Sequence, residues 1–98
     1  MPEMTFEVRW PDGSTQRCYS PSLVMHDYLC TGTHYTVGEF VDRSTRGLAE
    51  ASERVRAKFG FACTSAADTT ERIAGAAARF PQQALIQITG MHPALEQS

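Results

Sequence analysis

The sequence predicts an α+β domain of order ββαααβ, with a small three-stranded sheet and helices packed on one of its faces. Three observations predict this class: apolar and polar residues alternate over Thr5–Trp10, a long helical pattern runs between Thr36 and Gly60, and an apolar run fills 84–89. Ninety-eight residues allow one domain with a thin core.

The first element is a β-hairpin. Phe6, Val8 and Trp10 share one face of a half-buried strand, because their neighbours in sequence are polar. The segment Pro11-Asp-Gly-Ser14 has the residues of a tight turn, since proline presets φ and glycine accepts a positive φ. Residues 15–19 then return as the second strand.

A short first helix is expected after this hairpin. Ser20 can cap its exposed N–H groups, and Pro21 suits the first helical position because it has no N–H to leave unpaired. We expect the helix to reach Leu29 and to stop near Gly32.

The second helix is the clearest element. Thr36 and Glu39 form a capping-box pair, and Gly60 suits the left-handed position after the last turn. Three acid-to-base pairs at i,i+4 support its polar face: Glu39–Arg43, Asp42–Arg46 and Glu50–Arg54. Its apolar stripe consists of Val37, Phe40, Val41, Leu48, Val55 and Phe59, with Ser44, Ala51 and Ser52 as small fillers.

A third helix begins near Ser65 or Asp68 and ends at Pro81. Its small apolar face consists of Ala67, Ile73, Ala76, Ala77 and Phe80. Residues 84–89 form the last strand. We assign residues 1–90 to a single α+β domain and residues 91–98 to a mobile C-terminal tail.

Composition excludes some classes of function. The net charge is −2 and the pI about 5.8, so the basic surface of a nucleic-acid or anionic-membrane binder is missing. No apolar run approaches the ~20 residues that span a bilayer. Three cysteines and no secretory apolar segment predict a cytoplasmic protein without a disulfide framework.

Polar groups gather at the junction between the second strand and the first helix. Cys18, Tyr19, Ser20, Ser22 and His26 are the candidate ligand-binding residues, because exposed N–H groups at a helix start can receive an anion. Helix capping by the serines and ordinary burial of the thiol explain the same residues without a ligand.

Two further kinds of chemistry are open at this stage. His26 and Cys30 share a helix face as two metal ligands could, but Gly32 separates them from His34 and no motif supports a site. Cys18 and Cys63 lie close to helix starts, which can activate a thiol, although a place in the core is the simpler interpretation. We expect no catalytic residues, metal or cofactor, and at least two of the three thiols protected by folding.

Four segments match one family pattern together: Val8-Arg-Trp-Pro-Asp-Gly13, Cys18-Tyr-Ser-Pro-Ser22, Ala51-Ser-Glu-Arg-Val-Arg-Ala-Lys-Phe-Gly-Phe61 and Cys63. Through them the chain, from Phe6 to about Phe80, resembles a small bacterial nitrogen-starvation-response family. The family's genes stand beside a nitrilase gene in a cluster linked to cyanide or nitrile assimilation. The resemblance implies a cytoplasmic bacterial protein whose partners come from that cluster, and it brings no functional residues with it.

Two classes of function follow. The first is a non-catalytic accessory or adaptor protein of nitrilase-linked nitrogen scavenging. The alternative is a small-molecule or metal-binding protein with its site at residues 18–26. Because a three-stranded sheet leaves two open edges and aromatic residues are numerous, we also expect a homodimer or a stable hetero-complex, with the Ala-rich third helix as a contact.

Overall fold

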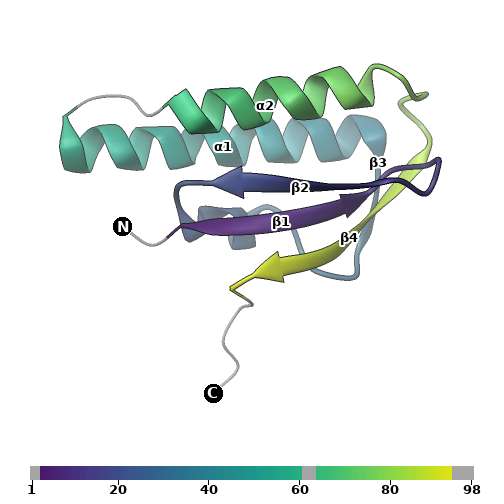
Figure 1. Ribbon diagram of the computed structural model, residues 1–98, viewed down its shortest axis with the longest axis horizontal. Helices are drawn as coiled ribbons and strands as arrows, with labels where there is room; N and C mark the ends of the chain where they lie inside the picture. The colour runs from purple at the N-terminus through teal and green to yellow at the C-terminus, as the bar shows by residue number, and fades with distance from the viewer. Residues whose placement is uncertain (1–2, 61–63, 94–98) are drawn as a thin grey trace.

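The computed structural model describes residues 3–60 and 64–93, and its elements follow one another in the order ββηβααβ (Figure 1). They are β1 (Met4–Arg9), β2 (Thr15–Ser20), the 3-10 helix η1 (Leu23–Asp27), β3 (His34–Thr36), α1 (Val37–Phe59), α2 (Thr64–Ala77) and β4 (Leu85–His92). The α+β class is confirmed, but the sheet has four strands rather than three and only two helices are α-helices.

The sheet is antiparallel throughout, with the strand order β2-β1-β4-β3. One face is buried under the helices, as expected. Its core side chains include Phe6 and Val8 from β1, Cys18 from β2 and Ile88 from β4. No element of the described residues lies over the other face, and Figure 1 shows both α-helices on one side of the strands, above them in this view.

The predicted hairpin is confirmed. Phe6, Val8 and Trp10 are all buried. The turn closes with two backbone hydrogen bonds: Trp10 N–H donates to the Ser14 carbonyl at 2.8 Å, and Gly13 N–H donates to the Trp10 carbonyl at 2.9 Å. Gly13 has φ +90°, the conformation for which glycine was expected there.

The first predicted helix is corrected. It is a single 3-10 segment over Leu23–Asp27, and its N-cap is Ser22, whose Oγ accepts from Val24 N–H at 3.3 Å. Ser20 cannot be the cap because it still belongs to β2, where it pairs with Met4. The short 3-10 segment therefore ends before Leu29, the predicted last residue.

Strand β3 was not predicted. Its three residues pair with β4 as His34 with Gln87, Tyr35 with Ile86 and Thr36 with Leu85. Three residues are too short for an alternating pattern to be visible in the sequence. The pairing with a strand fifty residues later makes this segment a strand.

Helix α1 matches its predicted bounds. Glu39 N–H donates to the Thr36 Oγ at 3.1 Å, and Gly60 has φ +81° after the last turn. Only half of the capping box forms, because the Glu39 carboxylate bonds Arg43 instead of returning to Thr36. All three expected i,i+4 ion pairs are present, with N–O distances of 2.8, 3.4 and 2.9 Å.

Two predicted apolar faces need correction. Phe59 is 51% exposed, because the last residues of α1, 56–59, extend past the core. Helix α2 starts at Thr64 and its regular turns end at Ala77, before Pro81. Ala67 faces solvent, since the buried face of α2 runs through Ala66, Thr69, Ile73 and Ala77.

Strand β4 starts one residue later and ends three residues later than predicted. Glu7 pairs with Gly90 and Val8 with Ile88, so Thr89 is an extra residue in a β-bulge. The bulge shifts the alternation by one, and Met91, not Gly90, faces the core at 3% exposure. The boundary predicted at residue 90 therefore cuts through β4, and residues 94–98 of the expected tail lie outside the described residues.

Two contacts join the layers. The Trp10 ring meets Phe40 of α1 edge-on and stacks on Phe80, with centroids 5.6 Å apart in both pairs. Gly47 of α1 lies against η1: a Cβ there would stand 2.7 Å from Met25 Sδ and 3.0 Å from the Tyr28 ring. The missing side chain thus lets η1 lie directly on α1.

The apolar stripe of α1 can be tested with two leucines. Leu48 is 1% exposed and Leu85 is 59% exposed. We expect Leu48→Ala to lower the free energy of unfolding by ~2–4 kcal/mol through lost burial and a cavity. Leu85→Ala serves as the matched control and should change it by less than ~0.5 kcal/mol. Urea unfolding measures the free energy of unfolding of both variants. Equal losses would contradict the assignment of Leu48 to the buried face and of Leu85 to the surface.

The close approach at Gly47 gives a second pair of variants. Gly47→Ala gains ~1 kcal/mol of helix propensity but forces apart two packed side chains, which costs ~1–3 kcal/mol. We therefore expect a net loss of stability. A Cβ at Gly75 of α2 meets nothing within 4 Å, so Gly75→Ala should stabilise the protein by ~0.5–1 kcal/mol. Thermal unfolding measures both variants. If both stabilise the protein, the close contact of Gly47 with Met25 and Tyr28 is contradicted.

Candidate functional site

The five candidate residues at the junction do not converge on one site. Cys18 faces the core, and burial raises the pKa of its thiol to about 12. Its sulfur lies 4.0 Å from the Gln16 carbonyl oxygen and bonds no imidazole. At neutral pH the group is a protonated core thiol, so it lacks the thiolate that a nucleophile or a metal ligand needs.

The two serines bond within the junction. The Ser20 hydroxyl donates to the Ser22 carbonyl at 2.8 Å and accepts from Ser22 N–H at 3.3 Å. Both residues are buried. Tyr19 lies on the opposite face of the sheet, where its hydroxyl donates to the Glu3 carboxylate at 2.8 Å. The serines therefore serve the turn and the cap. Of the other candidates, Tyr19 borders a separate small cavity of about 240 Å³ beside Thr69 of α2, and His26 lines a larger one.

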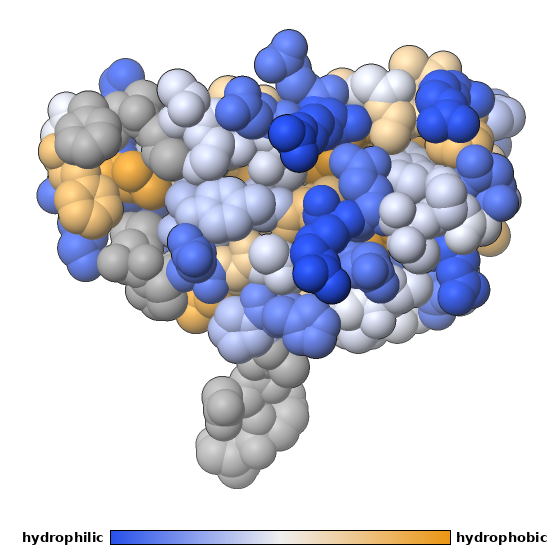
Figure 2. Space-filling model, viewed as in Figure 1, coloured by the Kyte–Doolittle hydropathy of each residue, from blue (hydrophilic) through white to orange (hydrophobic). Residues whose placement is uncertain are grey.

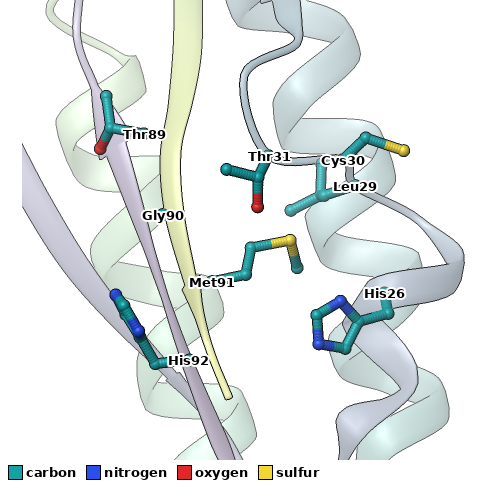
Figure 3. A pocket seen from close by; sticks show the side chains of 8 residues that line it. All are labelled: His26, Leu29, Cys30, Thr31, Thr89, Gly90, Met91 and His92. Atoms are coloured by element: carbon teal, nitrogen blue, oxygen red, sulfur yellow. The ribbon is translucent and has the colours of Figure 1, made fainter. Parts of the chain in front are cut away.

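That cavity has a volume of about 470 Å³ and lies between η1, the loop after it and the end of β4 (Figure 3). We call it the edge cavity; it is lined by His26, Leu29, Cys30, Thr31, Thr89, Gly90, Met91 and His92. The two imidazoles stand on opposite sides of it in Figure 3, while Leu29 and Met91 approach each other between them. Its size is that of a ligand pocket.

The polar groups of the edge cavity come from two walls. His26 Nε2 lies 2.9 Å from the Pro93 carbonyl oxygen, to which it can donate. Cys30 is exposed, and its sulfur points away from both histidines in Figure 3. No group of three or more His, Cys, Asp or Glu residues within 3–60 and 64–93 could hold a metal ion. The cavity thus offers imidazole, hydroxyl and backbone groups over an apolar floor.

Sequence analysis missed most of this cavity. Thr89, Gly90, Met91 and His92 reach it only because β4 continues past a bulge, which no pattern in the sequence indicated. The one available signal was His26, which the junction hypothesis included. A second histidine, His92, only three residues beyond the predicted strand could have suggested that the strand continues.

A second candidate surface is the uncovered face of the sheet, which we call the outer face. Strand register places Thr5, Glu7 and Arg9 of β1 on it, next to Tyr19, Arg17 and Thr15 of β2 and His92, Gly90 and Gln87 of β4. In Figure 2, which has the view of Figure 1, hydrophilic side chains gather across the middle of the molecule, where Figure 1 places β1 and β2. Within the described part of the chain, neither Arg9 nor Arg17 forms an ion pair.

The thiols give a direct test of this geometry. Cys63 lies outside the described residues, so the test uses a Cys63→Ser background. We expect Cys30 to react rapidly with a thiol reagent in the folded protein. Cys18 should react on the order of a thousandfold more slowly, because its labelling needs global unfolding. Adding Cys30→Ser should abolish the rapid phase, and rapid labelling of two thiols would contradict the buried position of Cys18.

None of the described helices has both the length and the apolar character that crossing a membrane requires. Comparison with curated proteins finds no match, and comparison with solved structures finds none either. Comparison with family models finds one, described as nitrogen starvation-induced protein NitG, which matches residues 5–91. That match spans the sheet, both α-helices and the edge cavity up to Met91, and it agrees with the nitrogen-starvation resemblance of the sequence. The chain therefore belongs to the NitG family of nitrogen starvation-induced proteins.

Proposed function

We propose that this nitrogen starvation-induced protein is a non-catalytic accessory protein of the cytoplasm, an adaptor that binds the nitrilase of a nitrogen-scavenging gene cluster. Membership of the NitG family supports the link to nitrogen starvation. The adaptor role is supported by one observation above others: a four-stranded sheet has one face under helices and the other without any covering element among the described residues.

The composition of the outer face favours a protein partner. Arg9 and Arg17 are exposed there without ion pairs in the described segments, and Tyr19 lies beside them. Arginine and tyrosine are enriched where proteins bind one another, since both offer apolar area together with directional hydrogen bonds. The partner surface would be acidic, because two unpaired guanidinium groups need carboxylates when water leaves the interface.

The expected homodimer stays a proposal and now has less support. Phe6, Trp10 and Phe40 are buried within one chain, so fewer aromatic rings need a partner than the composition suggested. The edge of β2 is also partly covered, since the Thr69 hydroxyl of α2 donates to the Tyr19 carbonyl at 2.8 Å. The small residues of α2 that face solvent include Ala67, Ala74 and Gly75.

The test is binding of the purified chain to the nitrilase encoded in its own cluster, followed by light scattering on a sizing column. We expect a complex that Arg9→Glu with Arg17→Glu weakens at least about tenfold, because reversed charges would face carboxylates. Arg56→Glu with Lys58→Glu, at the exposed end of α1, is the control and should bind like the wild type.

Three outcomes would count against the proposals. Absence of a complex with the wild-type chain would remove the nitrilase as partner. Equal affinities of both double variants would remove the outer face as the interface. A mass of one chain for the free protein at every concentration would remove the homodimer.

Ligand binding is the second candidate function, and the edge cavity is the observation that favours it. The site differs from the one expected at residues 18–26, because it keeps His26 and replaces the other four candidates with residues of β4 and the loop after η1. The chemistry of its walls determines what such a ligand would be.

A further inference from the structure

Beside the cavity, the edge of β4 has no neighbouring strand within residues 3–60 and 64–93. On this side β3 pairs with β4 only from Leu85 to Gln87. The loop before β3 adds two bonds at Ile88, whose N–H donates to the Thr33 carbonyl at 3.1 Å and whose carbonyl accepts from Gly32 N–H at 2.6 Å. From Thr89 to His92, no described segment continues the ladder on that side.

The bulge decides which backbone groups are left open. Before it, alternate residues of β4 turn their N–H and carbonyl toward the β3 side, as the bonds of Ile88 show. Thr89 is the extra residue, so after the bulge it is Met91 whose N–H and carbonyl point toward the β3 side. Neither the N–H nor the carbonyl of Met91 has a hydrogen-bond partner on this side within the described residues. Because Met91 also lines the edge cavity, one donor and one acceptor there are left without a partner among the described residues.

This pair of groups selects a particular chemistry. In an antiparallel ladder the residue opposite exchanges both bonds, so its own N–H and carbonyl flank a single Cα. An extended peptide has that spacing. A simple carboxamide carries its N–H and its carbonyl oxygen on one carbon. It therefore cannot bond the carbonyl and the N–H of Met91 at the same time with good geometry.

We propose that the edge cavity binds an extended peptide segment of another protein, which continues the line of β3 and pairs with β4 at Met91. Addition of a strand to a free sheet edge is an established way to recognise extended peptides. The free edge is four residues long, about 14 Å at the usual rise per residue, so it accommodates three or four peptide residues. The cavity volume of about 470 Å³ is adequate for a segment of that length.

Strand geometry also predicts the preferred side chain. The residue opposite Met91 projects its side chain to the same face of the sheet as Met91. There it would meet Leu29, so an apolar side chain is favoured. Its two neighbours point to the outer face, next to His92, where polar side chains are favoured. The cavity therefore selects a peptide with an apolar residue between two polar or small ones.

The inference is separate from the adaptor proposal, because the edge cavity and Arg9 and Arg17 are on different parts of the sheet. Its test uses ¹⁵N-labelled full-length protein and a pool of acetylated tripeptide amides with Leu, Ile, Val, Phe or Met at the centre and Ala on both sides. We expect saturable chemical-shift changes at the amides of Met91 and Thr31. The matched pool, N-methylated at the central residue, should bind about tenfold more weakly, since it loses one hydrogen bond.

Two variants complete the design. Thr31→Trp places a large side chain at an exposed position in the edge cavity and should abolish the changes. Glu53→Trp, on the exposed face of α1, is the control and should leave them intact. The proposal is overturned if neither pool gives saturable changes at millimolar concentration. It is also overturned if N-methylacetamide or the N-methylated pool matches the parent pool, or if Thr31→Trp binds like the wild type.

Discussion

The β-bulge opposite Glu7 is the constraint on which the C-terminal part of the structure depends. It adds Thr89 to β4, and the Thr89 hydroxyl secures it by donating to the Glu7 carboxylate at 2.8 Å. Without the extra residue, Gly90 would face the core and Met91 would face solvent. With it, an apolar side chain continues the core. The same shift turns the backbone of Met91 toward the edge cavity.

The layers of the molecule follow from burial on one side of the sheet. Helix α1 supplies the broad apolar surface, through Phe40 and Leu48, and α2 adds a narrower face through Ile73. The Trp10 ring joins β1 to Phe40 and to Phe80 after α2, which ties the hairpin to both helical segments. The described helices occupy a single face of the sheet, so none of them covers the outer face.

Residues with reactive or hydrogen-bonding groups fall into two sets, those buried in the fold and those at its surface or edge. Cys18, Ser20 and Ser22 are enclosed by the fold, where burial protonates the thiol and the hydroxyls serve local turns. Among the described residues, groups without a hydrogen-bond or ion-pair partner lie on the outer face, at Arg9 and Arg17, and at the end of β4, at the backbone of Met91. Both of these surfaces suit binding of another chain better than a reaction, which agrees with an accessory role in nitrogen starvation.

The sequence alone determined the hairpin and α1, because their signals are local. Pro11-Asp-Gly-Ser14 closes its own turn, and Thr36 and Gly60 set the ends of α1 from within a few residues. It also indicated the α+β class and the nitrogen-starvation family. Tertiary structure decided the features that need distant partners: β3 exists because β4 pairs with it, and β4 extends to His92 because β1 accommodates a bulge. The candidate site belongs to this second group. His26 was visible in the sequence, but the cavity it borders forms only when β4 passes beside η1, a contact between segments more than sixty residues apart.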